Sequence, residues 1–138
     1  MKQVCKVALL GALLASAGVS AATLQVKIDG VASAKGQLRV AVCDEASFLK
    51  KCTLGAQVPA RAGSVTVDVP AVPAGSWAVM VYHDENDNGK LDRDQMGIPT
   101  EGYGFSNGAT AKYGPPQFKQ AAVAVGAGTA QVQINLQY

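Results

Sequence analysis

The chain has 138 residues, of which 12 are Lys or Arg and 10 are Asp or Glu, so its formal net charge is only +2. A balance this close to neutral gives no electrostatic reason to expect nucleic acid or anionic lipid as a partner. The length suits a single domain. Six of the ten acids nevertheless lie within residues 84–101, where only Lys90 and Arg93 oppose them. This segment therefore carries a local negative charge that favours cations.

Residues 1–22 have the pattern of a secretory signal peptide. Two lysines give a positive start, an apolar run covers residues 7–17, and small residues follow it. The run is shorter than the about 20 residues that a membrane-spanning helix needs. The alternative to a signal peptide is a buried N-terminal helix. We expect cleavage after Ala21 or Ala22, and the cut after Ala22 leaves residues 23–138 as one periplasmic or secreted domain without a membrane span.

Alternating apolar and polar residues predict strands with one face in a core and one face in water. The alternation occurs in four segments, which are residues 24–28, 36–43, 64–69 and 131–136. Residues 77–82, WAVMVY, are instead apolar on both faces. They predict a central strand that is covered on both sides or by one long loop.

Two less regular strands and one short helix are also expected. Residues 120–125 form one strand, and Gly126 to Gly128 turn the chain into the last strand as a hairpin. Residues 57–60 form the other, and the proline within them places it at a sheet edge. Residues 44–51 predict one or two helical turns, with an aspartate as N-cap. About seven short strands with Gly- and Pro-rich turns predict a single antiparallel β-sandwich of the all-β class, with one long loop.

Two cysteines remain once the signal peptide, which carries Cys5, is removed. An even number in an exported chain predicts a disulfide between Cys43 and Cys52. The bridge closes a ten-residue loop and stabilises the fold by about 2–3 kcal/mol. A zinc site is not supported, because the chain has no CxxC motif and its only histidine is His83.

Residues 96–116 form a long segment rich in glycine and proline that also carries Tyr103, Phe105 and Tyr113. A loop of this length is uncommon inside a compact domain and is usually functional or disordered, and the aromatic residues argue against disorder. Two interpretations remain open. The aromatic residues either plug the open end of the sandwich or form a surface that binds a ligand or a partner.

The segment HDENDNGKLD, residues 83–92, follows the spacing of an EF-hand type calcium loop. Calcium prefers six to eight oxygen ligands, and Asp or Asn at alternate positions around a glycine supplies them. Gly89 falls at position 6, where the sharp turn favours glycine. The predicted ligands are Asp84, Asn86 and Asn88 at positions 1, 3 and 5, the carbonyl of Lys90 at position 7, and Asp92 at position 9.

The match to this loop fails at position 12, where Gln95 stands in place of a bidentate glutamate. Asp94 or Glu101 is expected to complete the ligand set, with Glu101 reaching back from the following loop. Because the loop follows a strand, we predict a calcium loop on a β scaffold, with the modest affinity of extracellular sites. The alternative is a metal-free turn, since Asp and Asn favour turns and Asn88-Gly89 is a strong turn dipeptide.

A catalytic role is the weaker hypothesis for the same segment. His83 is a candidate general base, but the chain has no second histidine, and no serine stands in a G-x-S-x-G motif. A single histidine at a strand end is more often structural. We therefore assign no catalytic residues and expect no enzyme.

The segment YHDENDNGKLDRDQMGIPTEGYGFSN and the later YGPPQF resemble a group of exported bacterial proteins known only as a domain of unknown function. Its hallmark has the form H-D-x-N-x-N-G-x-L-D, then G-x-P-x-E-G-Y-G-F-S, then G-P-P-x-F, which residues 83–92, 97–106 and 114–118 match. The stretch before it also resembles the hairpin entry of transthyretin-like sandwiches. The resemblance implies a transthyretin-like or immunoglobulin-like sandwich, and it places Glu101 and Asp84 in one signature. It implies no activity.

Three functions are carried forward as hypotheses. The first is a secreted, non-enzymatic module whose acidic loop binds Ca²⁺ and orders the Gly/aromatic loop for binding a protein, a glycan or a small ligand. The second is a transthyretin-like hydrolase of a small heterocycle. Such enzymes use several histidines and a terminal motif that residues 135–138 lack. The third is a metal-free structural or interaction domain.

Overall fold

The computed structural model describes residues 21–138, so the predicted signal peptide, apart from Ala21 and Ala22, lies outside the described residues. The strands are β1 (Ala21–Val31), β2 (Gln37–Cys43), β3 (Leu54–Pro59), β4 (Gly63–Pro73), β5 (Gly75–Asp84), β6 (Tyr103–Phe105), β7 (Ala122–Val125) and β8 (Gly128–Asn135). Two short helices, η1 (Ser106–Gly108) and α1 (Phe118–Ala121), lie between β6 and β7.

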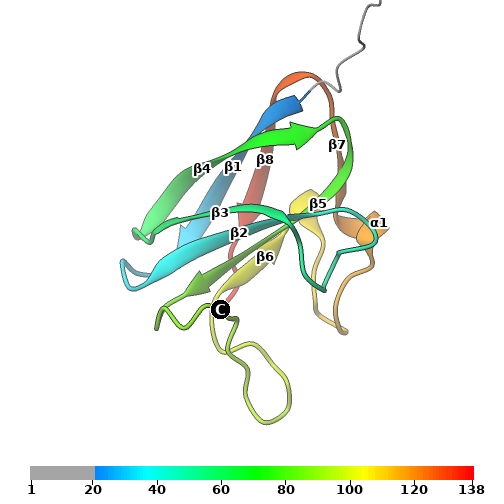
Figure 1. Cartoon of the computed structure of the whole chain (residues 1–138). Helices are drawn as coiled ribbons and strands as arrows, with labels where there is room; N and C mark the ends of the chain where they lie inside the picture. Colours follow the sequence, from blue (N-terminus) through cyan, green and yellow to red (C-terminus); the bar gives the residue numbers. More distant parts are fainter. Residues whose placement is uncertain (1–20) are drawn as a thin grey trace, which may run out of the picture.

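The strands form two sheets that pack face to face (Figure 1). One sheet has the strand order β4-β1-β8. The other has the order β3-β2-β5-β6, with β7 paired to the first part of β5. The predicted all-β sandwich is therefore confirmed. Within the described residues no helix is long and apolar enough to cross a membrane.

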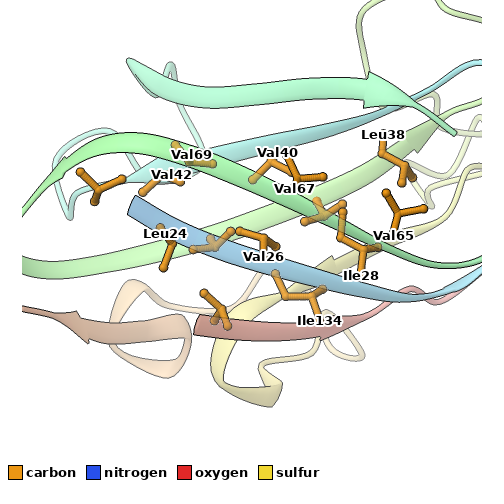
Figure 2. Packing of buried hydrophobic residues seen from close by; sticks show 14 of the residues in the cluster. Leu24, Val26, Ile28, Leu38, Val40, Val42, Val65, Val67, Val69 and Ile134 are labelled. Carbon is orange, nitrogen blue, oxygen red and sulfur yellow. The ribbon is translucent and has the colours of Figure 1, made fainter. Parts of the chain in front are cut away.

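The core between the sheets is built from the alternating apolar residues of the sequence. Along β1, β2 and β4 the apolar side chains are buried, while most of their polar neighbours are more exposed. Ile28, Leu38 and Val67 are each at most 2% exposed, and Figure 2 shows them packed together from the facing strands. Burying one such side chain stabilises the fold by about 1.5–3 kcal/mol, which fixes the face that each strand turns inward.

Strand β5 is the central strand of the larger sheet, as WAVMVY predicts. It pairs with β2 along one side and with β7 and then β6 along the other. Val79 and Val81 belong to the core between the sheets. Met80 belongs instead to a second apolar cluster that contains Phe48 and Phe105. Both faces of β5 are therefore covered.

The predicted hairpin at residues 126–128 is wrong. β7 pairs with β5 in the larger sheet, whereas β8 pairs in parallel with β1 in the smaller sheet, so the chain crosses between the sheets at this turn. The sandwich is consequently not wholly antiparallel. Alternation identifies a strand and its buried face but not the strand with which it pairs. Here β8 pairs with the edge of β1 that does not pair with β4.

Residues 44–51 form a single turn, the lower limit of the one or two helical turns expected. The Phe48 N–H donates to the carbonyl of Asp44 at 3.0 Å, and Leu49 then adopts a left-handed backbone with a φ of 59°. Asp44 does cap this turn, since its carboxylate accepts a hydrogen bond from the Ser47 N–H at 2.8 Å. The Cys43–Cys52 disulfide is present and closes the segment, as predicted.

Two strand boundaries also differ from the sequence-based expectation. β3 begins at Leu54, three residues earlier than predicted, and it lies at the sheet edge that its proline indicates. α1 takes up the first two residues of the predicted 120–125 strand, so that β7 begins at Ala122.

The long Gly/aromatic segment contains a strand that sequence analysis missed. β6 joins the two sheets, because Tyr103 pairs with Tyr82 of β5 on one side. On its other side Tyr103 exchanges two backbone hydrogen bonds of 2.9 Å with Gln137, just beyond β8. Three residues are thus enough to close one side of the sandwich.

Two glycines let β6 and the residue before it lie close to the end of the chain. A Cβ atom on Gly104 would lie 2.6 Å from the Cγ2 of Ile134 and 2.7 Å from the carbonyl oxygen of Asn135. A Cβ atom on Gly102 would lie 2.4 Å from the ring of Tyr138. The repeated glycine of EGYGF is therefore a packing requirement.

Gly104→Ala is expected to lower the free energy of unfolding by about 1–3 kcal/mol, because the added methyl group overpacks the contact with β8. Urea denaturation measures this loss. Gly126→Ala is the matched control, since its Cβ atom would meet nothing within 4 Å, and it should change stability by less than about 0.5 kcal/mol. Equal losses in the two variants would contradict the steric role of Gly104.

Candidate functional site

The acidic loop, residues 84–101, connects β5 to β6 and projects from one end of the sandwich (Figure 1). It begins at Asp84, whose side chain is fully buried. The Asp84 carboxylate accepts hydrogen bonds from the Arg39 Nε at 2.7 Å, the Gly89 N–H at 2.8 Å and the Asn88 N–H at 3.0 Å. Burial raises the pKa of Asp84, but these hydrogen bonds outweigh it, so the pKa lies below its ordinary value. Asp84 is therefore ionised, and it fixes the first turn of the loop.

Arg39 belongs to this site, and sequence analysis missed it. It lies on β2, directly across from Tyr82 of β5. Its guanidinium group binds the carboxylates of Asp84 at 2.7 Å and Asp87 at 3.2 Å, and it donates to the side-chain oxygen of Gln57 at 2.6 Å. The hydrogen bond with Asp84 raises the pKa of Arg39. The excess of acidic residues in the loop indicates from sequence that a positive charge must lie nearby. It does not indicate which basic residue supplies that charge.

Glu101 reaches back into the loop, as the sequence predicts. It is only 6% exposed. Its Oε1 accepts a hydrogen bond from the Glu85 N–H and its Oε2 accepts one from the Asp92 N–H, each at 3.0 Å. The structure thus unites Glu101 with the predicted ligand residues, in the role of a backbone hydrogen-bond acceptor.

The remaining predicted ligands gather around Asp92. Its carboxylate accepts hydrogen bonds from the side-chain amides of Asn86 at 2.6 Å and Asn88 at 2.8 and 2.9 Å. The two amide oxygens accept in turn from backbone groups, Asn86 Oδ1 from the Asn88 N–H at 3.3 Å and Asn88 Oδ1 from the Lys90 N–H at 3.1 Å. Asp92, Asn86 and Asn88 therefore form one exposed or half-exposed polar cluster.

Residues 92–100 fold into a tight hairpin above this cluster. The Thr100 N–H donates to the Asp92 carbonyl and the Asp94 N–H donates to the Ile98 carbonyl, both at 2.9 Å. Asp94, the other residue expected to complete the ligand set, caps its own turn instead. Its carboxylate accepts from the N–H groups of Met96 at 2.8 Å and Ile98 at 3.0 Å.

Between residues 21 and 138 no three His, Cys, Asp or Glu side chains are grouped closely enough to hold a metal ion. The carboxylates of Asp84 and Glu101 accept hydrogen bonds mainly from backbone N–H groups, whereas the half-buried Asp92 carboxylate accepts from the side-chain amides of Asn86 and Asn88. A cation here would need amide and carbonyl oxygens as well, and calcium loops do use such mixed oxygen sets.

His83, the candidate general base, is fully buried at the end of β5. Its Nε2 lies 2.6 Å from the carbonyl oxygen of Lys35, which can only accept, so Nε2 carries the proton. Its Nδ1 then accepts from the hydroxyl of Tyr138 at 2.7 Å, and that hydroxyl accepts from the Ala32 N–H at 3.0 Å. Both ring nitrogens are therefore used in holding the 32–35 turn and the last residue in place.

An apolar groove of about 500 Å³ lies beside the acidic loop. Three of the large apolar side chains that line it are well exposed, with Met96 at 83%, Ile98 at 55% and Leu49 at 47%. The groove is lined by residues of five segments, the disulfide-closed turn (Leu49), β5 (Met80), the acidic loop (Leu91, Arg93, Met96, Gly97, Ile98, Pro99), β6 (Tyr103, Phe105) and the loop after η1 (Ala111, Lys112, Gly114, Pro115).

The three predicted ligand-binding aromatic residues lie in different environments. Phe105 is 7% exposed and packs edge-on against Phe48, with the ring centroids 6.3 Å apart. Tyr103 is half-buried and lines the groove. Tyr113 is 94% exposed. Phe105 thus packs in the second apolar cluster, and Phe105 and Tyr103, but not Tyr113, line the groove.

Comparison with known proteins gives a family but no activity. The model of the family described as uncharacterized protein conserved in bacteria (DUF2141) matches residues 26–133. The chain belongs to this family. The match extends from β1 into β8 and so includes the acidic loop and the groove. No curated protein and no solved structure matches the chain.

Arg39→Met is expected to lower the free energy of unfolding by about 2–4 kcal/mol, because it leaves the buried Asp84 carboxylate without its cation. Chemical denaturation at pH 7 measures the loss. Arg61→Met, at an exposed position, is the control and should change stability by less than about 0.5 kcal/mol. Similar losses in both variants would contradict the role of the ion pair.

The same pair predicts a pH dependence. Because the pKa of Asp84 is lowered in the folded state, its contribution is fully present above the ordinary carboxyl pKa of about 3.9 and is lost as the pH falls through the folded value. The difference in stability between the unmodified chain and Arg39→Met should therefore narrow below about pH 4. A difference that stays constant down to pH 2 would overturn this assignment.

Proposed function

We propose that this chain is an exported, non-enzymatic binding module in which the acidic loop binds calcium and holds the neighbouring apolar groove in shape. The observation that carries the proposal is the gathering of Met96, Ile98 and Leu49 around one groove. Soluble domains seldom leave a contiguous apolar patch open to water unless it binds something. A concave apolar site of this size also falls within the range of ligand pockets.

Hydrogen bonds connect the polar cluster of the acidic loop to the hairpin that forms one wall of the groove. A ligand of the loop can therefore affect the shape of the groove. Asp92 belongs to the polar cluster, and its carbonyl begins the hairpin that carries Met96 and Ile98. Glu101 fixes both arms of the loop through the Glu85 and Asp92 N–H groups. A cation that binds the Asp92 carboxylate and restricts its motion therefore also makes one wall of the groove more rigid.

Calcium is supported by the type and spacing of the oxygens in the polar cluster. Asp92, Asn86 and Asn88 present carboxylate and amide groups of the kind that calcium prefers. Their positions follow the alternate spacing of a calcium loop. The amide NH₂ groups now point at Asp92, and they would have to turn over to offer oxygen, which favours a modest affinity. Arg39 already neutralises Asp84 and Asp87, which lowers the affinity further.

The second candidate is a metal-free binding module, and Arg39 is the observation that favours it. A guanidinium group with two carboxylate partners already supplies the loop with a cation from within the chain. The hydrolase hypothesis is weaker, because both nitrogens of the buried His83 are committed to structural hydrogen bonds.

Calcium at about 10 mM is expected to stabilise the fold by about 1.4–2.7 kcal/mol for a dissociation constant of about 10⁻⁴–10⁻³ M. This corresponds to a rise in melting temperature of about 5–10 °C. Differential scanning fluorimetry with calcium and with a chelator measures the shift. Superimposed melting curves would leave the metal-free module as the function.

Two variants in the same loop make that experiment specific. Asp92→Asn should abolish the calcium shift, because it removes the central carboxylate of the polar cluster. Asp87→Asn removes the same charge from the same loop but at a residue whose carboxylate faces Arg39, and it should keep the shift. Loss of the shift in both variants would point to the charge of the loop in general and not to a site at Asp92.

Export is the other part of the proposal, and the burial of Ala22 favours one of the two expected cleavage sites. Ala22 is 3% exposed and pairs with Val72 of β4 and Gly128 of β8. Cleavage after Ala22 would remove this core residue, whereas cleavage after Ala21 retains it. We expect the exported chain to begin at Ala22, as measured by intact mass spectrometry. A mass that begins at Thr23 would contradict this expectation.

A further inference from the structure

We propose that the apolar groove binds a small anionic amphiphile, an apolar chain that ends in a carboxylate or a similar acidic group, with Arg93 and Lys112 holding the charge. This inference rests on the proposed function, which makes the groove the binding surface, and it specifies the chemistry of the ligand. No part of it depends on calcium.

The apolar half of the ligand is indicated by the shape and lining of the groove. Met80 and Phe105 come from the sheet, and Leu91 and Ile98 face them from the acidic loop. The volume of about 500 Å³ lies within the range of pockets that bind small molecules. Covering Met96 and its neighbours would remove apolar surface that now contacts water.

The anionic half is indicated by the charged residues of the lining. Arg93 and Lys112 are the two charged residues that line the groove, and no carboxylate lines it. Across the described residues neither of them has a salt bridge. Arg93 donates one hydrogen bond, from Nη1 to the Gly97 carbonyl at 2.9 Å, and a guanidinium group has further donors. The Lys112 Nζ lies 5.6 Å from the ring centre of Tyr113.

The nearby acids do not compensate these two cations, although the segment as a whole is acidic. Asp94 uses its carboxylate on the N–H groups of its own turn. Glu101 is buried and turned into the acidic loop. The carboxylates of Asp94 and Glu101 are thus occupied by backbone N–H groups, and the groove presents Arg93 and Lys112 to a ligand without a carboxylate in its lining.

The groove walls are held in place without a ligand. Arg93 and Pro99 form a β-bridge across the hairpin. Leu49 lies in the left-handed region with a φ of 59°, within the turn that the Cys43–Cys52 disulfide closes. A leucine in this conformation is uncommon and persists only where the surroundings enforce it. A preformed groove avoids the entropic cost of ordering on binding.

A second copy of the chain is a poorer occupant than an amphiphile. A two-fold symmetric interface brings the same patch of both subunits together. Each copy would then bring Arg93 and Lys112 into the contact and no carboxylate from the groove lining, and like charges across an interface oppose association. An anionic ligand neutralises the same two residues.

The test uses 1-anilinonaphthalene-8-sulfonate, an anionic apolar fluorophore, bound to the folded mature chain. Decanoate and decyltrimethylammonium, which share a chain length and differ in charge, then compete below their micellar concentrations. Decanoate should displace the fluorophore at a concentration about tenfold lower than the cationic competitor. Equal displacement by both would overturn the anion preference while leaving the groove as a binding site. No fluorescence gain with the folded chain would overturn the proposed groove ligand altogether.

Two double variants that remove the same charge from different places locate the site. The double variant Arg93→Gln with Lys112→Gln should weaken displacement by decanoate about tenfold. Its melting temperature should stay unchanged, because both side chains are exposed. The control, Lys35→Gln with Arg61→Gln, removes the same charge from exposed positions outside the groove and should bind as the unmodified chain does. Equal weakening in both double variants would place the binding elsewhere. A concentration-dependent dimer that Ile98→Glu dissociates would replace the amphiphile with a second copy, whatever the outcome of the calcium melts.

Discussion

The buried carboxylate of Asp84 is the group on which one end of this molecule depends. An ionised side chain removed from water destabilises a fold by several kcal/mol unless its oxygens are satisfied. Here a guanidinium group from β2 and two backbone N–H groups from the acidic loop satisfy them. Because these partners come from two separate segments, satisfying one charge also fixes the direction in which the loop leaves the sheet.

Glu101 repeats this arrangement at the other end of the loop. The chain between two buried carboxylates cannot move freely, since each anchors backbone N–H groups of the loop. The hairpin of residues 92–100 stands on this base and supplies one wall of the groove. Two charged side chains, Asp84 and Glu101, are therefore buried at the base of the loop, while the apolar side chain of Met96 is exposed on its surface.

The features that are properties of a single strand, namely its position in the chain and its buried face, could be predicted from the sequence. Alternation in β1, β2, β4 and β8 identified the buried faces, because each inward side chain must be apolar. The pairing of β8 with β1 could not be predicted, because a parallel partner leaves no turn between the two strands. The short strand β6 was hidden by its glycines, which lower strand propensity but are needed where Gly104 approaches Ile134.

In the candidate site, too, the local features could be predicted from the sequence and the long-range contacts could not. The spacing of Asp84, Asn86, Asn88 and Asp92 is a local property, so the sequence identified the loop. The approach of Glu101 followed from its place nearby in the chain. Arg39 was not predicted, because it lies 45 residues from Asp84 and meets it only through the pairing of β2 with β5. The groove likewise combines five segments of the chain, and Leu49 and Met80, which lie outside the signature, join it only through the fold.

The parallel pairing of the first and last strands has a consequence for the order of folding. β1 is the middle strand of the smaller sheet, and its partner residues on β8, such as Gln25 and Gln131, lie 106 residues apart in the chain. Contacts of such long separation form slowly and late. The smaller sheet cannot be completed until the final strand is available. For a chain that is exported as proposed, this delay keeps the polypeptide unfolded while it is translocated. The sandwich then closes only after the whole chain has crossed the membrane.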